Sequence, residues 1–428
     1  MITVGAISDD LTSALESAGA FAGRGMSSCV ALGIDSIAKL QSVQCVAVDT
    51  DTRALAERAA RDRMADAMRA IGARGILIKT MDSTLRGHLL LEIQTALAVS
   101  KRYVAIVAPA FPSEGRTTVG GRQFVDGVPV AETAFQRDPV WPISQSDICE
   151  ILRQGTLDLV QSVQDPANAN LTLRIEESIV AQQRTAFVID AVTQAQLDDL
   201  CQLVERPEQV LWVGSPGLLI ALANRLGAST QQKAAVSIPR ASGPIIVGVG
   251  SVNPASREQL SMLQSRRSLP VAAIDPDLAL EDPQHAAMEA IASLCNSALS
   301  SPILSVTTRL PTKLQGNHLP AEPSSFRQER GTDPVIQAIG IAVVHLSERL
   351  NSSHYVLTGG ATALEVSRQL GAHGFTVTGM MEPGIPVATL AGATGTVIAK
   401  AGGFGDPELL IRACDYMQQT VQNRRDLD

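Results

Sequence analysis

The sequence predicts an α/β protein of two domains, each a mainly parallel sheet flanked by helices. Short β-branched runs alternate with longer amphipathic stretches almost from end to end. The short runs are apolar throughout, which is typical of strands buried on both faces of a parallel sheet. A polar stretch with two prolines, Ser237–Pro244, interrupts the alternation before it begins again. We therefore place a domain boundary there, with residues 1–236 in the first domain and residues 237–428 in the second.

In the first domain, strands are expected at the β-branched runs and helices at the amphipathic stretches between them. The expected strands are Thr3–Ser8, Ser28–Leu32, Cys45–Asp49, Gly75–Lys79, Tyr103–Ala108, Ala186–Asp190 and Gln209–Val213. The expected helices include Leu11–Arg24, Ala54–Ile71, Leu89–Val99 and Gln194–Val204. The segment Gln123–Val130 differs, because an Asp-Gly pair between short apolar pairs predicts a β-hairpin.

The second domain repeats the alternation. Its expected strands are Ile245–Val249, Ile303–Val306, Tyr355–Leu357 and Thr396–Lys400. Helices are expected from Ala255, over Pro334–Leu350, over Thr362–Leu370 and from near Pro407. Between Thr307 and Thr332, three prolines and little periodicity predict a long loop.

The composition argues against a nucleic-acid partner. The chain has 428 residues, of which 45% are hydrophobic and 18% charged, as in globular proteins. The chain has 35 basic and 43 acidic residues, so its formal charge is −8. It therefore has no excess of basic residues to bind the phosphate backbone of a nucleic acid. Two Trp, three Tyr and eight Phe offer few platforms for base stacking.

The same patterns argue for a cytoplasmic protein that binds no membrane. The first residues lack the features of a signal peptide, and no run of about 20 apolar residues could span a bilayer. The six cysteines form no CxxC pair and the six histidines form no HExxH or HxH, so we expect reduced cysteines and no zinc site. Length and charge leave the oligomeric state open, a homodimer included.

Side chains that can carry chemistry gather where strands of the first domain end, and parallel sheets bind ligands at those ends. Asp9 and Asp10 follow the first strand and open a helix. One of them is explained as the N-cap, but the second is not, because adjacent carboxylates repel each other. We therefore interpret at least one of them as a catalytic or ligand-binding group.

Two further strand ends carry cations. Arg53 could bind a carboxylate or phosphate in bidentate fashion, or lie solvated beside a capped helix start. From Lys79 to His88, two cations, a carboxylate, three hydroxyls and a glycine fall within ten residues, which indicates a site for an anionic, polyhydroxylated ligand. His88 is also explained as a helix-start residue. Arg116, in the loop Ala108–Val119, is explained almost as well by a rigid connector.

In the second domain, the segments that follow the strands are rich in glycine rather than in charged residues. The segments Gly248–Pro254, Thr358–Thr362 and Lys400–Pro407 each follow a strand and open a helix. Glycine lets the backbone approach a ligand closely, and helix N-termini offer N–H groups to phosphate oxygens. One such loop would be ordinary turn chemistry, but three in one domain predict a nucleotide-phosphate site. Neither GxxxxGK[ST] nor GxGxxG with a trailing acid is present.

We therefore expect the first domain to hold a small acid and the second to hold ATP, with the active site in the cleft between them. Such a division of labour is typical of a small-molecule kinase.

Five segments resemble motifs of the four-carbon acid sugar kinase family, in the family's order and over almost the whole chain. They are Ile7–Ser13, Lys79–Gly87, Ala108–Pro139, Thr358–Ala363 and Lys400–Pro407. The resemblance is weak only over residues 270–333. It implies ATP-dependent phosphorylation, with Mg²⁺, of the terminal C4 hydroxyl of a tetronate such as D-threonate, D-erythronate or a 3-oxo-tetronate.

The resemblance also implies site residues. Family contacts to the substrate fall on Asp9, Asp10, Arg53, Asp82, Ser83, Thr84 and Leu85. Family contacts to ATP fall on Ser251, Gly359, Gly360, Ala361, Thr362 and Gly403. From their place in the same segments we add Lys79 and Arg86 on the substrate side and Gly402 on the ATP side; no residue is assigned to a metal.

The chain departs from the family pattern at three places. Ser13 stands where the family usually has glycine, and the turn Gly250–Pro254 departs from the usual sequence, though it keeps the serine. Ala361 stands where an acid is common. If that acid holds the nucleotide or the metal in relatives, this chain holds them differently or more weakly.

For the mechanism, we expect Arg53, helped by Lys79 or Arg86, to pair with the substrate carboxylate. Asp82 and one of the two carboxylates after the first strand would bind its hydroxyls. Asp10 would take the proton of the attacking hydroxyl, and Asp82 is the second catalytic candidate. Positioning and charge neutralisation supply most of the catalysis in phosphoryl transfer.

Two other functions remain open at this point. A sugar-acid sensor without activity fits the alanine at position 361. An oxidoreductase that uses a dinucleotide fits the α/β pattern but lacks the glycine fingerprint.

Overall fold

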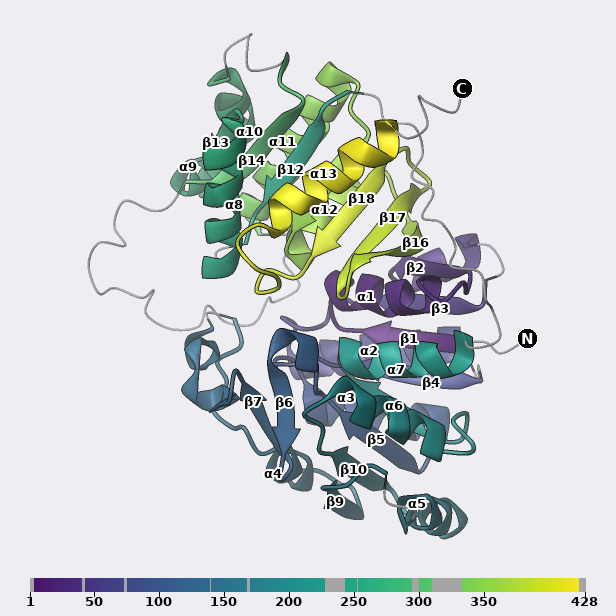
Figure 1. Cartoon of the computed structure of the whole chain (residues 1–428). Coiled ribbons are helices and arrows are strands. Elements are labelled where there is room, and N and C mark those ends of the chain that lie inside the picture. The colour runs from purple at the N-terminus through teal and green to yellow at the C-terminus, as the bar shows by residue number, and fades with distance from the viewer. Residues whose placement is uncertain are drawn as a thin grey trace. The chain divides into compact units, whose positions relative to one another are not determined.

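The computed structural model describes residues 4–40, 43–72, 75–138, 140–167, 170–227, 243–251, 253–294, 300–309 and 333–422 (Figure 1). These residues form two compact units, an N-terminal unit up to residue 227 and a C-terminal unit from residue 243. The predicted domain boundary between residues 236 and 237 lies outside the described residues.

The elements of the N-terminal unit alternate along the chain. Its strands are β1 (Val4–Ser8), β2 (Ser28–Leu32), β3 (Cys45–Asp49), β4 (Ile76–Thr80), β5 (Val104–Ala108), β6 (Arg116–Val119), β7 (Arg122–Val125), β8 (Val128–Pro129), β9 (Leu159–Val163), β10 (Thr185–Ile189) and β11 (Leu211–Gly214). Its helices are α1 (Leu11–Ala22), α2 (Glu57–Ile71), α3 (Leu89–Ser100), α4 (Ile148–Arg153), α5 (Asn170–Val180), α6 (Gln194–Leu203) and α7 (Pro216–Gly227), with 3₁₀ turns η1 (Ile34–Lys39), η2 (Pro112–Glu114), η3 (Val130–Glu132) and η4 (Ala134–Arg137).

The central sheet of this unit is parallel and has the strand order β2-β3-β1-β4-β11-β5-β10-β9. Helices α1, α7 and α6 pack side by side in one layer, and α2, α3 and α4 pack in another. After β1 the chain forms β2 and β3 on one side of it and then β4 on the other. The order therefore reverses at β1, and such a reversal is where doubly wound sheets bind ligands.

Most of the parallel strands form where the sequence predicts them, because they are buried on both faces. Strand β9 was not predicted, because polar and partly exposed residues interrupt its apolar pattern. All five residues of β1, β3, β4, β5 and β10 are buried. The predicted hairpin is also confirmed, since Val125 pairs with Val128 across Asp126 and Gly127. Both turn residues have positive φ, 51° and 80°, as a two-residue hairpin turn requires.

The C-terminal unit has a second sheet. Its strands are β12 (Ile245–Val249), β13 (Val271–Ile274), β14 (Ile303–Thr308), β15 (His354–Thr358), β16 (Gly374–Glu382), β17 (Ile385–Ala391) and β18 (Thr396–Lys400). Its helices are α8 (Pro254–Arg267), α9 (Pro276–Glu281), α10 (Pro283–Ala292), α11 (Pro334–Leu350), α12 (Gly360–Gln369) and α13 (Leu409–Gln422). Helices α9 to α12 pack against one another, as do α8 and α13.

The strand order in this unit is β13-β14-β12-β15-β18-β17-β16. Strands β12, β14, β15 and β18 are parallel, as expected, and β13, which was not predicted, pairs in parallel with β14. Strands β16 and β17 form an antiparallel hairpin that the sequence analysis missed. Thr307 and Thr308, which were expected to begin a loop, instead complete β14, and residues 310–332 of the expected loop lie outside the described residues.

All five cysteines in the described residues are buried thiols. Among the helices of the same residues, none combines the length and the apolar character needed to cross a membrane.

Candidate functional site

The carboxyl ends of β1, β3 and β4 carry the predicted acid-binding residues, and these strands are neighbours in the sheet. The segments after them approach closely. A Cβ atom built on Gly87 would lie 2.7 Å from Oδ2 of Asp9, and Gly87 has a φ of +95°. Only glycine fits this backbone position without strain. The sheet order thus brings Asp9, Arg53 and the segment after β4 together, as predicted.

Arg53 joins the two carboxylates that follow β1. Its Nε and Nη2 donate to Oδ2 and Oδ1 of Asp9 at 2.7 and 2.9 Å, and its Nη1 donates to Oδ2 of Asp10 at 2.7 Å. Burial would raise the pKa of Asp9, but the charges of Arg53 and Lys79 hold it below its ordinary value. Three of the five N–H groups of the Arg53 guanidinium thus donate to Asp9 and Asp10, and the other two remain for a ligand.

Asp10 has a structural task as well. Its side chain caps α1 by accepting from the backbone N–H of Ser13 at 2.9 Å and from the Thr12 hydroxyl at 3.1 Å. Asp10 is 21% exposed, whereas Asp9 is 2% exposed. Of the two adjacent carboxylates, Asp10 is therefore the one that a ligand can reach.

Asp82 organises the turn after β4. Its Oδ2 accepts from Thr84 Oγ1 at 2.5 Å and from Arg86 Nε at 2.6 Å, and Arg86 Nη1 also donates to Asp138 at 3.2 Å. Burial would raise the pKa of Asp82, but Arg86 and Arg53 hold it well below its ordinary value. Asp82 is therefore ionised at neutral pH and can accept hydrogen bonds from hydroxyl groups.

Backbone hydrogen bonds fix Leu85 and Ser83 in this turn. Leu85 has a φ of +66°, in the left-handed region, and donates its N–H to the carbonyl of Asp82 at 2.9 Å. The Ser83 side chain is buried, and its carbonyl accepts from Gln123 Nε2 at 2.7 Å. The predicted run from Asp82 to Arg86 is thus a fixed turn rather than a solvated loop.

Lys79 lies deeper than the sequence analysis expected. Its Nζ is 3.0 Å from Oε2 of Glu92 on α3, and the two side chains are 2% and 5% exposed. Lys79 also donates to the carbonyl of Thr80, and Thr52 donates to Glu92 at 3.3 Å. Because it is buried beneath the strand ends and paired, Lys79 supports the site rather than reaching a ligand, and its expected pairing with a substrate carboxylate is not supported by this geometry.

Sequence reasoning missed three carboxyl groups around these strand ends. Glu92 interrupts the apolar run Leu89–Ile93, and burial raises its pKa to about 6 although Lys79 opposes the shift. Glu16 lies within α1, a helix in which every residue is buried. Asp138 follows η4 and binds Arg86. For Glu92 and Glu16, the sequence does offer a signal, because each is an acidic residue within an otherwise apolar stretch of a helix.

For His88 and Arg116, the structure supports a structural explanation rather than contact with a ligand. His88 Nε2 lies 2.7 Å from the carbonyl of Leu55, and its ring packs edge-on against Trp141. Arg116 is buried, lies 3.8 Å from Asp126 and sits over the ring of Phe135. Both side chains hold the loops around the hairpin.

In the C-terminal unit, the three glycine turns follow β12, β15 and β18, which are adjacent parallel strands. A Cβ atom built on Gly250 would lie 2.3 Å from Thr362 Oγ1, and one built on Gly402 would lie 2.5 Å from Ser251 Oγ. Gly359 has a φ of +95° and approaches Ser251 and Thr362. The turns therefore converge as predicted. Their close approach leaves no room for a side chain at Gly250 or Gly402, and the positive φ of Gly359 favours glycine there.

Helix α8 fixes these turns from one side. Asn253 caps it, with Oδ1 accepting from the N–H of Ala255 at 3.0 Å, and a Cβ atom on Gly403 would lie 3.3 Å from Asn253 Nδ2. Gln259 Nε2 donates to the carbonyls of Phe404, Gly405 and Asp406 at 2.9–3.0 Å. The cradle formed by the three turns is thus made mostly of backbone, with a helix N-terminus directed at it, as anion sites require.

Gly360 and Ala361 open α12, and Ala361 is exposed. Beneath the cradle, Lys400 is buried and donates to the carbonyl of Gly402 at 3.2 Å. No group of three or more His, Cys, Asp or Glu side chains among the described residues is arranged to hold a metal ion.

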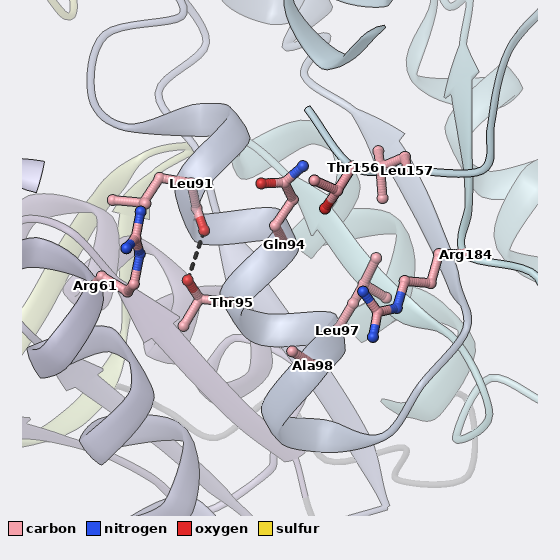
Figure 2. Close-up of a pocket in the computed structure, with 9 residues that line it drawn as sticks. All are labelled: Arg61, Leu91, Gln94, Thr95, Leu97, Ala98, Thr156, Leu157 and Arg184. Carbon is pink, nitrogen blue, oxygen red and sulfur yellow. Dashed lines mark hydrogen bonds between the residues drawn. The ribbon is translucent and has the colours of Figure 1, made fainter. Parts of the chain in front are cut away.

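A separate pocket of about 240 Å³ lies along α3 (Figure 2). Its lining comprises Arg61, Leu91, Gln94, Thr95, Leu97, Ala98, Thr156, Leu157 and Arg184. None of the predicted site residues is among them. This pocket and the strand-end cluster are therefore different places on the N-terminal unit.

Comparison with known proteins yields two family models. The one described as "Sugar-binding N-terminal domain" matches residues 4–222, which is about half of the chain. The one described as "Nucleotide-binding C-terminal domain" matches residues 246–410. The acid-binding cluster falls within the first match, and the glycine cradle falls within the second.

Curated relatives cover most of the chain. A D-threonate kinase of Salmonella typhimurium is 30% identical over 80% of this chain and 81% of its own. A D-threonate kinase of Bordetella bronchiseptica is 30% identical over 99% and 98%. A 3-oxo-tetronate kinase of Cupriavidus necator is 27% identical over 96% of both chains.

A solved structure from Salmonella typhimurium LT2, provisionally described as a tRNA synthase, has a TM-score of 0.77 and covers 96% of this chain and 99% of its own. At 21% identity, this likeness shows a shared fold and carries nothing about activity.

Proposed function

Because the chain belongs to the four-carbon acid sugar kinase family, we propose that it transfers the γ-phosphoryl group of ATP to a four-carbon sugar acid. The acceptor is the terminal C4 hydroxyl of a tetronate such as D-threonate, D-erythronate or a 3-oxo-tetronate. Residues 1–236 bind the acid sugar and residues 237–428 bind the nucleotide.

The observation that carries this proposal is the convergence of the three glycine turns around Ser251. A phosphate chain needs N–H donors, and the turns after β12, β15 and β18 bring backbone N–H groups and helix starts together. Gly359, Gly360, Thr362, Gly402 and Gly403 would line it.

On the acid-sugar side, Arg53 and Arg86 offer the N–H donors that an anion needs. Asp82 accepts hydrogen bonds from substrate hydroxyls, with Thr84 and Leu85 shaping the turn. Asp10 accepts the proton of the attacking hydroxyl, because it is the more exposed of the adjacent carboxylates.

We expect Mg²⁺ to bind together with the nucleotide. The described residues form no all-protein cage for the ion, and Mg²⁺ commonly binds through substrate phosphates and water. When bound, Mg²⁺ would neutralise charge on the phosphate oxygens. Ala361 supplies no carboxylate that could bind the ion.

The direct test is a coupled ADP-release assay with D- and L-threonate, D- and L-erythronate and their 3-oxo forms, each with ATP and Mg²⁺. Longer sugar acids serve as the negative control. We expect ADP release with at least one four-carbon acid and none with the longer ones. Ligand binding without ADP release would instead favour a sensor, and quenching of NADH or NADPH fluorescence would favour an oxidoreductase.

Gly402→Ala should weaken ATP binding by about tenfold (about 1.4 kcal/mol), because the new methyl group would lie 2.5 Å from Ser251 Oγ. Isothermal titration with ATP and with the acid sugar separately measures the effect, and the acid sugar should bind as in the wild type.

The matched control for this variant is Gly340→Ala. Its Cβ would meet the end of the Gln369 side chain at 2.6 Å, also in the C-terminal unit but away from the turns. Equal weakening of ATP binding in both variants would contradict the cradle assignment.

A further inference from the structure

Gln123 on β7 is a polar side chain that is completely buried, at 0% exposed, and that has no role in the chemistry described above. Its Nε2 donates to the carbonyls of Ser83 at 2.7 Å and of Pro109 at 3.4 Å, and its Oε1 accepts from the Thr118 hydroxyl at 2.8 Å. The flipped amide would place Oε1 against two carbonyl oxygens, so these partners fix its orientation. Gln123 is thus a rigid internal contact and does not touch a ligand.

The hairpin that carries Gln123 is joined to the parallel sheet independently of the turn after β4. Thr118 on β6 and Ala191 after β10 exchange two backbone hydrogen bonds, both 3.0 Å long. The buried carboxylate of Asp190 accepts from the N–H of Gly121, in the turn between β6 and β7, at 2.8 Å. These contacts hold both strands of the hairpin against the sheet, so Gln123 is presented from a fixed support.

The segment that Gln123 holds is the turn that presents Asp82. The Ser83 carbonyl belongs to the peptide unit that joins Ser83 to Thr84. Because a peptide unit is planar, a hydrogen bond to this carbonyl also orients the backbone of Thr84. The Thr84 hydroxyl in turn donates to Oδ2 of Asp82 at 2.5 Å. A continuous series of contacts therefore leads from the hairpin to the carboxylate that is proposed to bind the substrate hydroxyls.

Loss of the Gln123 amide would release this turn. Among the described residues, the Ser83 carbonyl accepts no hydrogen bond other than the one from Gln123. Ser83 and Thr84 are both buried, and a buried carbonyl without a donor is unfavourable, so the turn would shift until the carbonyl finds another one. A binding site whose supporting contacts leave it about 1 Å too loose loses function even when all its residues are present.

We propose that Gln123 is a positioning residue of the acid-sugar site, which acts through the Ser83 carbonyl to keep the Asp82 carboxylate in the orientation that binds substrate hydroxyls. This inference rests on the proposed function, because it takes the turn after β4 as part of the substrate site. It concerns the acid sugar alone, since the proposed nucleotide turns belong to the other unit.

The experiment compares the wild type with Gln123→Met, which keeps the length of the side chain but has no N–H to donate. Calorimetry without ATP measures the Kd for D-threonate, or for the tetronate that the ADP-release assay selects. This Kd and the corresponding KM should rise by about tenfold or more, kcat should fall by a smaller factor, and the Kd for ATP should stay as in the wild type. Amide hydrogen exchange over Asp82–His88 should be faster than in the wild type.

Two control variants separate positioning from a loss of stability. Thr118→Val removes the hydroxyl that donates to Gln123 but leaves the bond to Ser83, so it should lower the melting temperature and keep the wild-type Kd for the acid sugar. Gln259→Met is the same change at another completely buried glutamine, whose Nε2 donates to carbonyls of Phe404–Asp406 in the C-terminal unit. It too should bind the acid sugar as the wild type does.

The proposal is overturned if Gln123→Met binds the acid sugar as tightly as the wild type, or if either control variant weakens this binding equally. If Gln123→Met does not fold, Gln123→Asn replaces it with the same expected results, because its amide is one methylene group too short to keep the bond to Ser83. The proposed function fails separately, if no four-carbon acid yields ADP. Hydrogen exchange needs no ligand, so even then unchanged exchange over Asp82–His88 would refute the role of Gln123.

Discussion

Replacing Lys79 by Met should lower the free energy of unfolding of the N-terminal unit by about 3–5 kcal/mol. Its Nζ lies 3.0 Å from Glu92 in a buried pair, so the substitution leaves the Glu92 carboxylate without its cation. Both tryptophans of the sequence, Trp141 and Trp212, lie in this unit. Urea unfolding followed by tryptophan fluorescence therefore reports on this unit alone.

Two comparisons make the result specific. The double variant Lys79→Met/Glu92→Leu should recover most of the loss, because apolar replacements of a whole buried pair are often close to neutral. Arg69→Met breaks the exposed pair with Asp66 and should cost at most about 1 kcal/mol. If the double variant loses the sum of the two single losses, Lys79 and Glu92 do not act as a pair.

Asp10→Asn should lower kcat by about 10²-fold or more and leave ATP affinity unchanged. Asparagine keeps the oxygen that accepts from the N–H of Ser13, so the cap of α1 survives and the fold is maintained. It cannot take a proton from the attacking hydroxyl, and it weakens the contact with Arg53. Steady-state kinetics and calorimetry with ATP measure the two quantities.

The control for this variant is Asp147→Asn, the same change at the N-cap of α4. Its turnover should equal that of the wild type, since Asp147 caps by accepting from the N–H of Glu150 and lies outside the proposed site. If Asp10→Asn retains turnover within about threefold of the wild type, Asp10 is not the proton acceptor, and Asp82 becomes the leading candidate.

The sequence predicts the parallel strands and the polar turns at their carboxyl ends well, for a physical reason. Buried strands must be apolar on both faces, so charge and glycine clusters directly after them mark the sheet edge. The strands β2, β3, β12 and β18 match the predicted bounds residue by residue. The adjacency of β1, β3 and β4 then brings Asp10, Arg53 and Asp82 to one edge.

The contacts within that edge were not predictable from sequence. Whether Arg53 binds its own carboxylates or only a ligand depends on the approach of two loops, and sequence spacing does not encode that. The Lys79–Glu92 pair joins a strand to the helix after it, across residues that show no pairing pattern. The antiparallel hairpin of β16 and β17 was missed because β16 alternates between buried and more exposed residues and has bulges, and because Pro386 interrupts the apolar pattern of β17.

The triple attachment of Arg53 has a consequence for the thermodynamics of recognition. An arginine normally loses about 2 kcal/mol of rotamer freedom when it is immobilised. Here Asp9 and Asp10 immobilise it during folding. The remaining donors of the guanidinium are thus preorganised, and an incoming anion gains them without ordering a flexible side chain.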